Sequence, residues 1–150
     1  MLSIEKVDEN NKQRIIDFLR ADVVHHVFAF YDIQYEPQHT DAYVALDNEG
    51  LMGYVLVYTA LDFPSVILEG ENRAAERLLD HAPRNRFIMH IPPDLLRTVK
   101  SKFPSTKCYV ENWMLVTKDE AKFIRSTLAR RLKTADVPKF GALLSTREEH

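Results

Sequence analysis

Residues 41–58, DAYVALDNEGLMGYVLVY, decide the fold of this chain. Residues 42–46 and 51–59 each have the apolar, β-branched and aromatic composition of a strand. Between them, Asp47-Asn48-Glu49-Gly50 is a strong turn signal, so the stretch predicts an antiparallel hairpin. Gly53 lies inside the second strand, where a glycine indicates a bulge or a close approach of another backbone segment.

Before this hairpin the sequence predicts one strand and two helices. Residues 2–7 fit a short opening strand, and residues 9–21 carry apolar side chains at helical spacing with charged ones between them. Asp22 is a suitable N-cap for a second helix that reaches about Tyr31. That segment is apolar on most sides, so we expect it to be well buried.

After the hairpin, strands alternate with helices. The expected elements are a strand at 65–68, a helix around 74–79, a strand at 87–91, a helix that starts at Pro92-Pro93, and a strand at 108–116. Such an alternation with one hairpin predicts an α/β (α+β) fold, in which a mixed sheet is flanked by helices on both faces.

Composition narrows the class of protein. The chain has 150 residues, 45% of them hydrophobic and 28% charged, which is ordinary for a globular domain with a real core. The formal net charge of −2 gives no basic field for nucleic acid, and no stretch reaches the roughly 18 apolar residues of a membrane span. Cys108, the single cysteine, has no intrachain partner, which favours a reducing compartment. We therefore expect a cytoplasmic protein that binds neither nucleic acid nor membrane.

The amino-acid composition changes near the end of the chain. Residues 122–133 carry five basic side chains and no acid, and residues 134–144 fit the start of a capped helix. We interpret residues 1–121 as one domain. Residues 122–150 are then a linker with the first strand and helix of a following unit.

Three motifs carry a resemblance to a known family. Residues 41–58 resemble the hairpin of the GNAT (N-acetyltransferase) superfamily, and residues 65–79 resemble its central strand and main helix. Residues 130–144, RRLKTADVPKFGALL, are similar to the opening of a GNAT domain. The resemblance implies a GNAT-like acyl-CoA N-acyltransferase fold, and it implies that this chain is the N-terminal half of a two-domain protein.

The same resemblance implies acetyl-CoA as the cofactor of the full-length protein, held by a glycine-rich loop after the central strand. At that position the sequence reads LEGENRA, residues 68–74, with Gly70 as its one glycine. Glu69 and Glu71 would repel phosphates there, whereas Arg73 offsets part of the repulsion. We expect no strong binding of acetyl-CoA by this chain. The candidate cofactor contacts are Gly70, Asn72 and Arg73.

Candidate catalytic residues are few. His26 lies in the predicted second helix, which borders the substrate cleft in the family that the chain resembles. Tyr109 lies near the place of a general-acid tyrosine in that family. The adjacent His25 and His26 would point about 100° apart on a helix, which excludes a shared metal, so we predict no metal site. We expect one of the two rings to be exposed and the other to be partly buried and hydrogen-bonded.

Three functions remain open at this stage. The first is an N-terminal domain of a GNAT-family N-acetyltransferase, which shapes the acceptor site beside a C-terminal GNAT half or a second subunit and is inactive alone. The second is a stand-alone binding or dimerisation module, with a homodimer as one form. The third is a complete acetyltransferase with an atypical coenzyme loop.

Overall fold

The structure is a computed structural model that describes residues 1–112 and 133–145. It contains two compact units, Met1–Cys108 and Tyr109–His150. The predicted domain boundary between residues 121 and 122 lies outside the described residues and stays a prediction.

The first unit is built on a single mixed sheet with the strand order β1-β2-β3-β4-β5. Neighbouring strands are antiparallel from β1 to β4, and β5 is parallel to β4. The strands are β1 (Ser3–Lys6), β2 (Thr40–Asp47), β3 (Gly50–Tyr58), β4 (Ser65–Gly70) and β5 (Ile88–His90). The helices are α1 (Lys12–Ala21), α2 (Val27–Tyr35), α3 (Asn72–Leu78) and α4 (Leu96–Lys102), with 3-10 turns η1 (Pro37–His39), η2 (Leu79–His81) and η3 (Pro93–Leu95).

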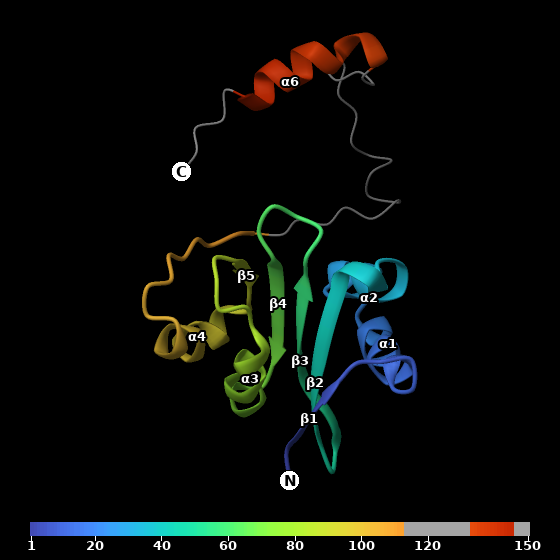
Figure 1. Cartoon of the computed structure of the whole chain (residues 1–150), viewed down its shortest axis with the longest axis vertical. Coiled ribbons are helices and arrows are strands. Elements are labelled where there is room, and N and C mark those ends of the chain that lie inside the picture. The colour runs from blue at the N-terminus through green and yellow to red at the C-terminus, as the bar shows by residue number, and fades with distance from the viewer. Residues whose placement is uncertain (113–132, 146–150) are drawn as a thin grey trace. The chain divides into compact units, whose positions relative to one another are not determined.

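Helices cover both faces of the sheet, as the sequence predicts. Figure 1 shows α1 and α2 on one side and α3 and α4 on the other. Alternation along β3 divides the core, because Tyr54 and Leu56 face α1 and α2 whereas Val55 and Val57 face α3 and α4. Side chains of β3 thus fill two separate apolar clusters, which makes β3 the central strand of the unit.

Local chemistry explains the hairpin. The Asp47 carboxylate accepts a hydrogen bond from the Glu49 amide at 2.8 Å, and Gly50 takes a φ of +133° that other residues rarely adopt. The register of β2 and β3 shifts between Ala45 and Leu46, so a bulge lies beside Gly53. A side chain at Gly53 would put its Cβ 2.5 Å from the Glu69 carbonyl oxygen. Both interpretations of Gly53, bulge and close approach, are therefore confirmed.

The prediction for the second helix is wrong in its start and in its burial. Asp22 accepts a hydrogen bond from the His25 amide at 3.2 Å, which closes a turn instead of capping a helix, and α2 begins at Val27. Only Ala29 and Ile33 of α2 are fully buried against the sheet. The side chains on its other side are exposed although they are apolar.

The predicted strand at 108–116 is not formed over residues 108–112, and the rest of it lies outside the described residues. In the second unit the predicted capped helix is confirmed. It consists of the 3-10 turn η4 (Thr134–Asp136) and α6 (Val137–Ser145). The Asp136 carboxylate accepts a hydrogen bond from the Lys133 amide at 2.8 Å, which fixes the start of this segment.

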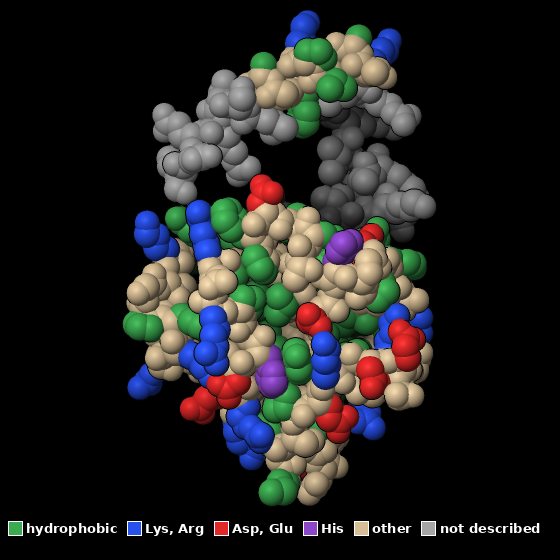
Figure 2. Space-filling view, in the orientation of Figure 1, with side chains coloured by type: hydrophobic (Ala, Val, Ile, Leu, Met, Phe, Trp, Pro, Cys, Tyr) green, Lys and Arg blue, Asp and Glu red, His purple; other side chains and the backbone are tan. Residues whose placement is uncertain are grey.

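Charged side chains of both signs are interspersed over the visible face of the first unit, as Figure 2 shows, in keeping with a net charge near zero. Among the described residues, none of the helices has the length and apolar character needed to cross a bilayer.

The two facing glycines generate the first prediction. Substituting Gly70→Ala places a Cβ against the Gly53 Cα and the Met52 carbonyl, at a residue whose φ is +124°. We expect a loss of roughly 3 kcal/mol in the free energy of unfolding, measured by urea denaturation. Gly50→Ala is the matched control, because its φ is also positive but no atom lies within 4 Å of the new Cβ. An equal loss in both variants would show that the contact between Gly53 and Gly70 is not what requires glycine.

Candidate functional site

A cluster of four polar side chains lies between the sheet and the turn that precedes α2. Tyr54 of β3 and Glu69 of β4 are direct partners in the antiparallel register, so their side chains share one face. The Tyr54 hydroxyl lies 3.0 Å from His26 Nδ1, and a Glu69 carboxylate oxygen lies 3.1 Å from His25 Nε2. Each histidine therefore contacts one residue of a strand pair.

The two histidines are not on a helix, which corrects the geometry predicted for them. Their rings are in edge-to-face contact with centroids 4.6 Å apart, because the turn after Asp22 directs both side chains toward the sheet. The remainder of the prediction is confirmed, because His25 is exposed and His26 is partly buried and hydrogen-bonded.

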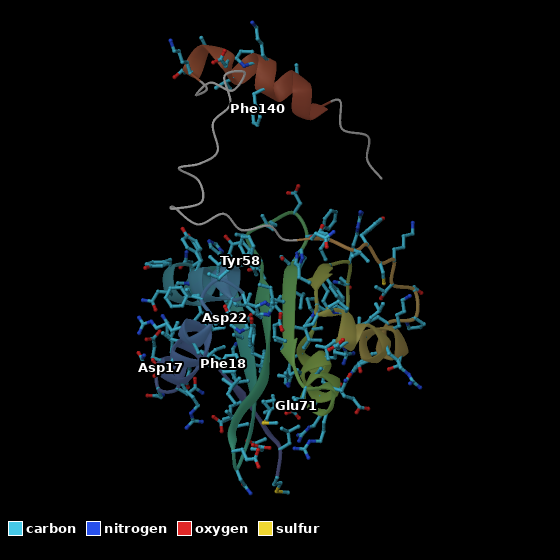
Figure 3. All side chains as sticks on the ribbon, turned by 180° about the vertical axis from the view of Figure 1, so that it is seen from behind. Asp17, Phe18, Asp22, Tyr58, Glu71 and Phe140 are labelled. Atoms are coloured by element: carbon cyan, nitrogen blue, oxygen red, sulfur yellow. The ribbon has the colours of Figure 1, made fainter. Side chains whose placement is uncertain are left out.

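Phe18 closes the inner side of this cluster. Its ring lies 5.4 Å from the ring of His26 and 6.3 Å from that of Tyr54, measured between centroids. Figure 3 shows the neighbours Asp17 and Phe18 on α1, and Phe18 is the one that packs against the core on this face. An apolar wall on this side strengthens the hydrogen bonds of the cluster, since it excludes water from them.

Burial sets the protonation of Tyr54 and His26. The Tyr54 side chain is fully buried, and this burial together with the Glu69 charge raises the pKa of its hydroxyl far above the ordinary value. Tyr54 therefore keeps its proton. Burial, and then the neighbouring His25, lower the pKa of His26. Both shifts fit a hydrogen bond that the Tyr54 hydroxyl donates to Nδ1 of a neutral His26, so this contact positions the His26 ring.

His25 and Glu69 form the more exposed pair of the cluster. Burial raises the pKa of Glu69, whereas the charge and hydrogen bond of His25 act in the opposite direction. The carboxylate holds the ring of His25 through Nε2, while half of the His25 side chain is exposed. A histidine oriented by a carboxylate and open to solvent is the arrangement of a general base.

The turn between β4 and α3 holds the three predicted cofactor contacts. The backbone of Gly70 packs against that of Gly53, and the Glu71 amide donates to the Met52 carbonyl at 3.1 Å. Asn72 accepts a hydrogen bond from the Thr98 hydroxyl at 2.6 Å. Arg73 lies 3.5 Å from the Asp47 carboxylate. The three residues are neighbours, but Asn72 and Arg73 already bind other parts of the chain.

These residues do not fit the phosphates of acetyl-CoA. An open depression of about 620 Å³ lies at the turn, and its lining includes Arg73 together with the carboxylates of Glu71 and Asp94. The predicted pairing of Glu69 with Glu71 at this place is wrong, because Glu69 lies against His25 and only Glu71 lines the depression. Glu71 and Asp94 would repel a diphosphate at this turn, and the Glu71 amide is already bound to the Met52 carbonyl.

Tyr109, the other predicted catalytic residue, belongs to the second unit and is 70% exposed. Its catalytic role stays a prediction. Within residues 1–112 and 133–145, no three side chains of His, Cys, Asp or Glu are grouped as a metal site would require.

Sequence reasoning missed Tyr54, Glu69, His25 and Phe18 as members of one site. To predict that Tyr54 and Glu69 are neighbours, one must know the register between β3 and β4. The six-residue connection between these strands, which contains Pro64, does not fix that register. Strand alternation alone places Tyr54 and Leu56 on one face, but it does not reveal which residues of β4 stand opposite them.

The His25–Glu69 contact generates the second prediction. Substituting His25→Gln removes the positive charge that lowers the pKa of Glu69, so we expect that pKa to move further upward. The change is measured by NMR titration of the Glu69 side-chain carbon. His39→Gln is the control, because His39 is exposed and its ring contacts Tyr58 instead. If the pKa of Glu69 were the same in the unchanged protein, in His25→Gln and in His39→Gln, the contact between His25 and Glu69 would be contradicted.

No protein-family model matches the sequence, and no curated protein matches it. Among solved structures, the chain is similar to a ribosomal-protein-alanine N-acetyltransferase from Brucella melitensis biovar Abortus 2308, with 11% identity and a TM-score of 0.47 over 77% of this chain and 100% of that chain. It is similar to a predicted acetyltransferase from Clostridium acetobutylicum, solved with acetyl-CoA, with 12% identity and a TM-score of 0.44 over 80% of this chain and 98% of that chain. It is also similar to an acetyltransferase of the GNAT family from Staphylococcus aureus, with 13% identity and a TM-score of 0.42 over 54% of this chain and 63% of that chain. These three solved structures are acetyltransferases, and one of them is named as a member of the GNAT family.

Proposed function

We propose that this chain is the acceptor-side domain of a GNAT-type N-acetyltransferase and that it does not itself hold the coenzyme. One observation carries the proposal. The His25–Glu69 pair and the β4–α3 turn meet at the same end of β4, and only the first of them is suited to chemistry. A base at this end serves the acceptor, whereas the coenzyme phosphates would be bound by a C-terminal half or a second subunit.

The pair has a definite task in such a reaction. An amine is protonated near neutral pH and must lose a proton before its nitrogen can attack an acyl group. His25 Nε2 is bound to Glu69, so the proton would be taken at the other ring nitrogen, Nδ1, and passed to solvent from the exposed side of the ring. Glu69 orients the ring and stabilises its positive charge, and Tyr54 fixes His26 beside it.

The negative charge of Glu71 and Asp94 at this turn generates the third prediction. We expect no measurable binding when acetyl-CoA is titrated into this chain by calorimetry, because Glu71 and Asp94 line the depression of about 620 Å³ at the turn and would repel its phosphates. Micromolar binding, with NMR shifts at Gly70, Asn72 and Arg73, would instead support the complete acetyltransferase considered from the sequence. The variant Glu71→Gln with Asp94→Asn tests the cause, since removal of the two charges should allow weak binding only if repulsion dominates.

Binding of the acceptor generates the fourth prediction. Lysine, spermidine and a short peptide with a free amino terminus are the probes, and the NMR signals of the His25 ring are the readout. We expect at least one probe to shift these signals and the variant Glu69→Gln to weaken its binding by about tenfold, the loss of one charge-assisted contact. His39→Gln should bind as the unchanged protein does.

The third prediction, on acetyl-CoA, and the fourth prediction, on amines, can be contradicted independently of each other. Binding of acetyl-CoA would contradict the proposal that another half or subunit holds the coenzyme, but it would not contradict the proposed acceptor site. If none of the three amines shifted His25, the acceptor role itself would be excluded, whatever the result with acetyl-CoA.

A second candidate function, a binding or dimerisation module, is favoured by a separate observation. Several large apolar side chains of α2 and of the turn before it are exposed on the side opposite the sheet. Exposed apolar surface of this kind is typical of protein contacts.

A further inference from the structure

The turn of residues 22–26 joins α1 to α2, and two histidine rings hold it on the sheet. We call it the linking turn. His25 Nε2 lies 3.1 Å from a Glu69 carboxylate oxygen on β4, and His26 Nδ1 lies 3.0 Å from the Tyr54 hydroxyl on β3. Each ring thus joins the linking turn to a different strand.

The other hydrogen bonds of the linking turn are local. The amides of His25 and His26 donate to the side chain and to the carbonyl of Asp22, at 3.2 and 3.0 Å, and Asp22 is labelled in Figure 3. Within the described chain, no backbone group of this turn binds the sheet. Its other two side chains, Val23 and Val24, are 45% and 51% exposed. The hydrogen bonds of the two rings are therefore what ties the linking turn to the sheet.

The contact with Tyr54 requires an uncharged His26. The Tyr54 side chain is fully buried, and His26 is the hydrogen-bond partner of its hydroxyl among the described residues. That hydroxyl can donate to a neutral ring, but an imidazolium carries a hydrogen on both nitrogens and accepts from neither. A proton from solvent at Nδ1 would therefore leave the hydrogen of a buried hydroxyl without an acceptor.

The contact with Glu69 also weakens in acid. His25 binds the carboxylate, and a hydrogen bond to a charged group is roughly twice as strong as one between neutral groups. A proton from solvent on Glu69 removes that charge. Burial raises the pKa of Glu69, so the loss occurs at a higher pH than for an exposed glutamate. Acid thus acts on both contacts in the same direction.

Neighbouring groups set the pH at which His26 takes up its proton. The titratable groups around the two rings come from the linking turn and from both strands, and they are His25, Asp22, Tyr54 and Glu69. Helix α1 contributes the apolar ring of Phe18, 5.4 Å from that of His26 between centroids. Burial and then His25 lower the pKa of His26 from 6.5, whereas Asp22 acts in the opposite direction. The contribution of His26 to the bound turn is therefore complete above pH 6.5 and is lost as the pH falls through the lowered pKa.

We propose that the linking turn is an acid-operated switch, which lies on the sheet at neutral pH and leaves it when His26 and Glu69 take up protons. Both protons come from solvent, and the two hydrogen bonds to the strands are what breaks. Through His26 alone, the ratio of bound to released turn falls about tenfold for each unit by which the pKa of His26 lies below its ordinary value. The inference goes beyond the proposed function and does not require it, because the switch works without a substrate.

The test is an NMR titration of the whole chain from about pH 7.5 to about pH 5. We expect the NOE between the rings of Phe18 and His26 to disappear as His26 titrates. The amide signals of the linking turn should shift over the same range, while those of the hairpin around Gly50 stay dispersed.

Two variants test the cause. Tyr54→Phe removes the hydroxyl that favours the neutral ring, so the pKa of His26 should rise by about half to one unit, the effect of one hydrogen bond. His39→Gln is the control, because His39 is exposed and its ring contacts Tyr58, and this variant should switch as the unchanged protein does. Circular dichroism verifies that both variants are folded.

Three results would overturn the proposal, and the first two need only the unchanged protein. An NOE that persists after His26 has titrated would show that the charged ring stays in place. Loss of the hairpin signals over the same pH range would show that the whole unit unfolds. A pKa of His26 that is the same with and without the Tyr54 hydroxyl would show that this contact does not sense the proton.

Discussion

The contact between the backbones of β3 and β4 at Gly53 and Gly70 is the constraint on which the rest of the first unit depends. Because neither residue has a Cβ, the strands can approach closely where β4 turns into α3. The bulge at Ala45–Leu46 accommodates this approach on the other side of β3. The register that results places Tyr54 opposite Glu69. Without that register the two histidines would have no strand residues to bind.

The polar cluster separates two kinds of histidine by their surroundings alone. His26 is partly buried, so its pKa is lowered and it serves as a neutral acceptor for the Tyr54 hydroxyl. His25, one residue earlier, is exposed and bound to a carboxylate whose own pKa burial has raised. Adjacent residues in the chain thus have different roles, because one ring points into the core and the other to its edge. A single turn thus supplies one ring that is held in the core and one that is held at the edge of the sheet.

The elements that sequence predicts well here are those fixed by local chemistry. The hairpin depends on the Asp47 carboxylate and on Gly50, both visible in the sequence, and the helix at the end of the described chain depends on Asp136 in the same way. The start of α2 was mispredicted because the capping signal of Asp22 is used for a turn. The cluster was not predicted as a whole, because Tyr54 and Glu69 meet only through the pairing of distant strands, which no local pattern encodes.

The hydrogen bond from the Glu71 amide to the Met52 carbonyl has a mechanical consequence. α3 begins at the next residue, so a force that swings α3 outward also pulls on β3 beside the hairpin tip. These two segments, which are distant in sequence, are thus linked by a backbone hydrogen bond. Outward displacement of α3 requires either that this bond breaks or that β3 moves with it.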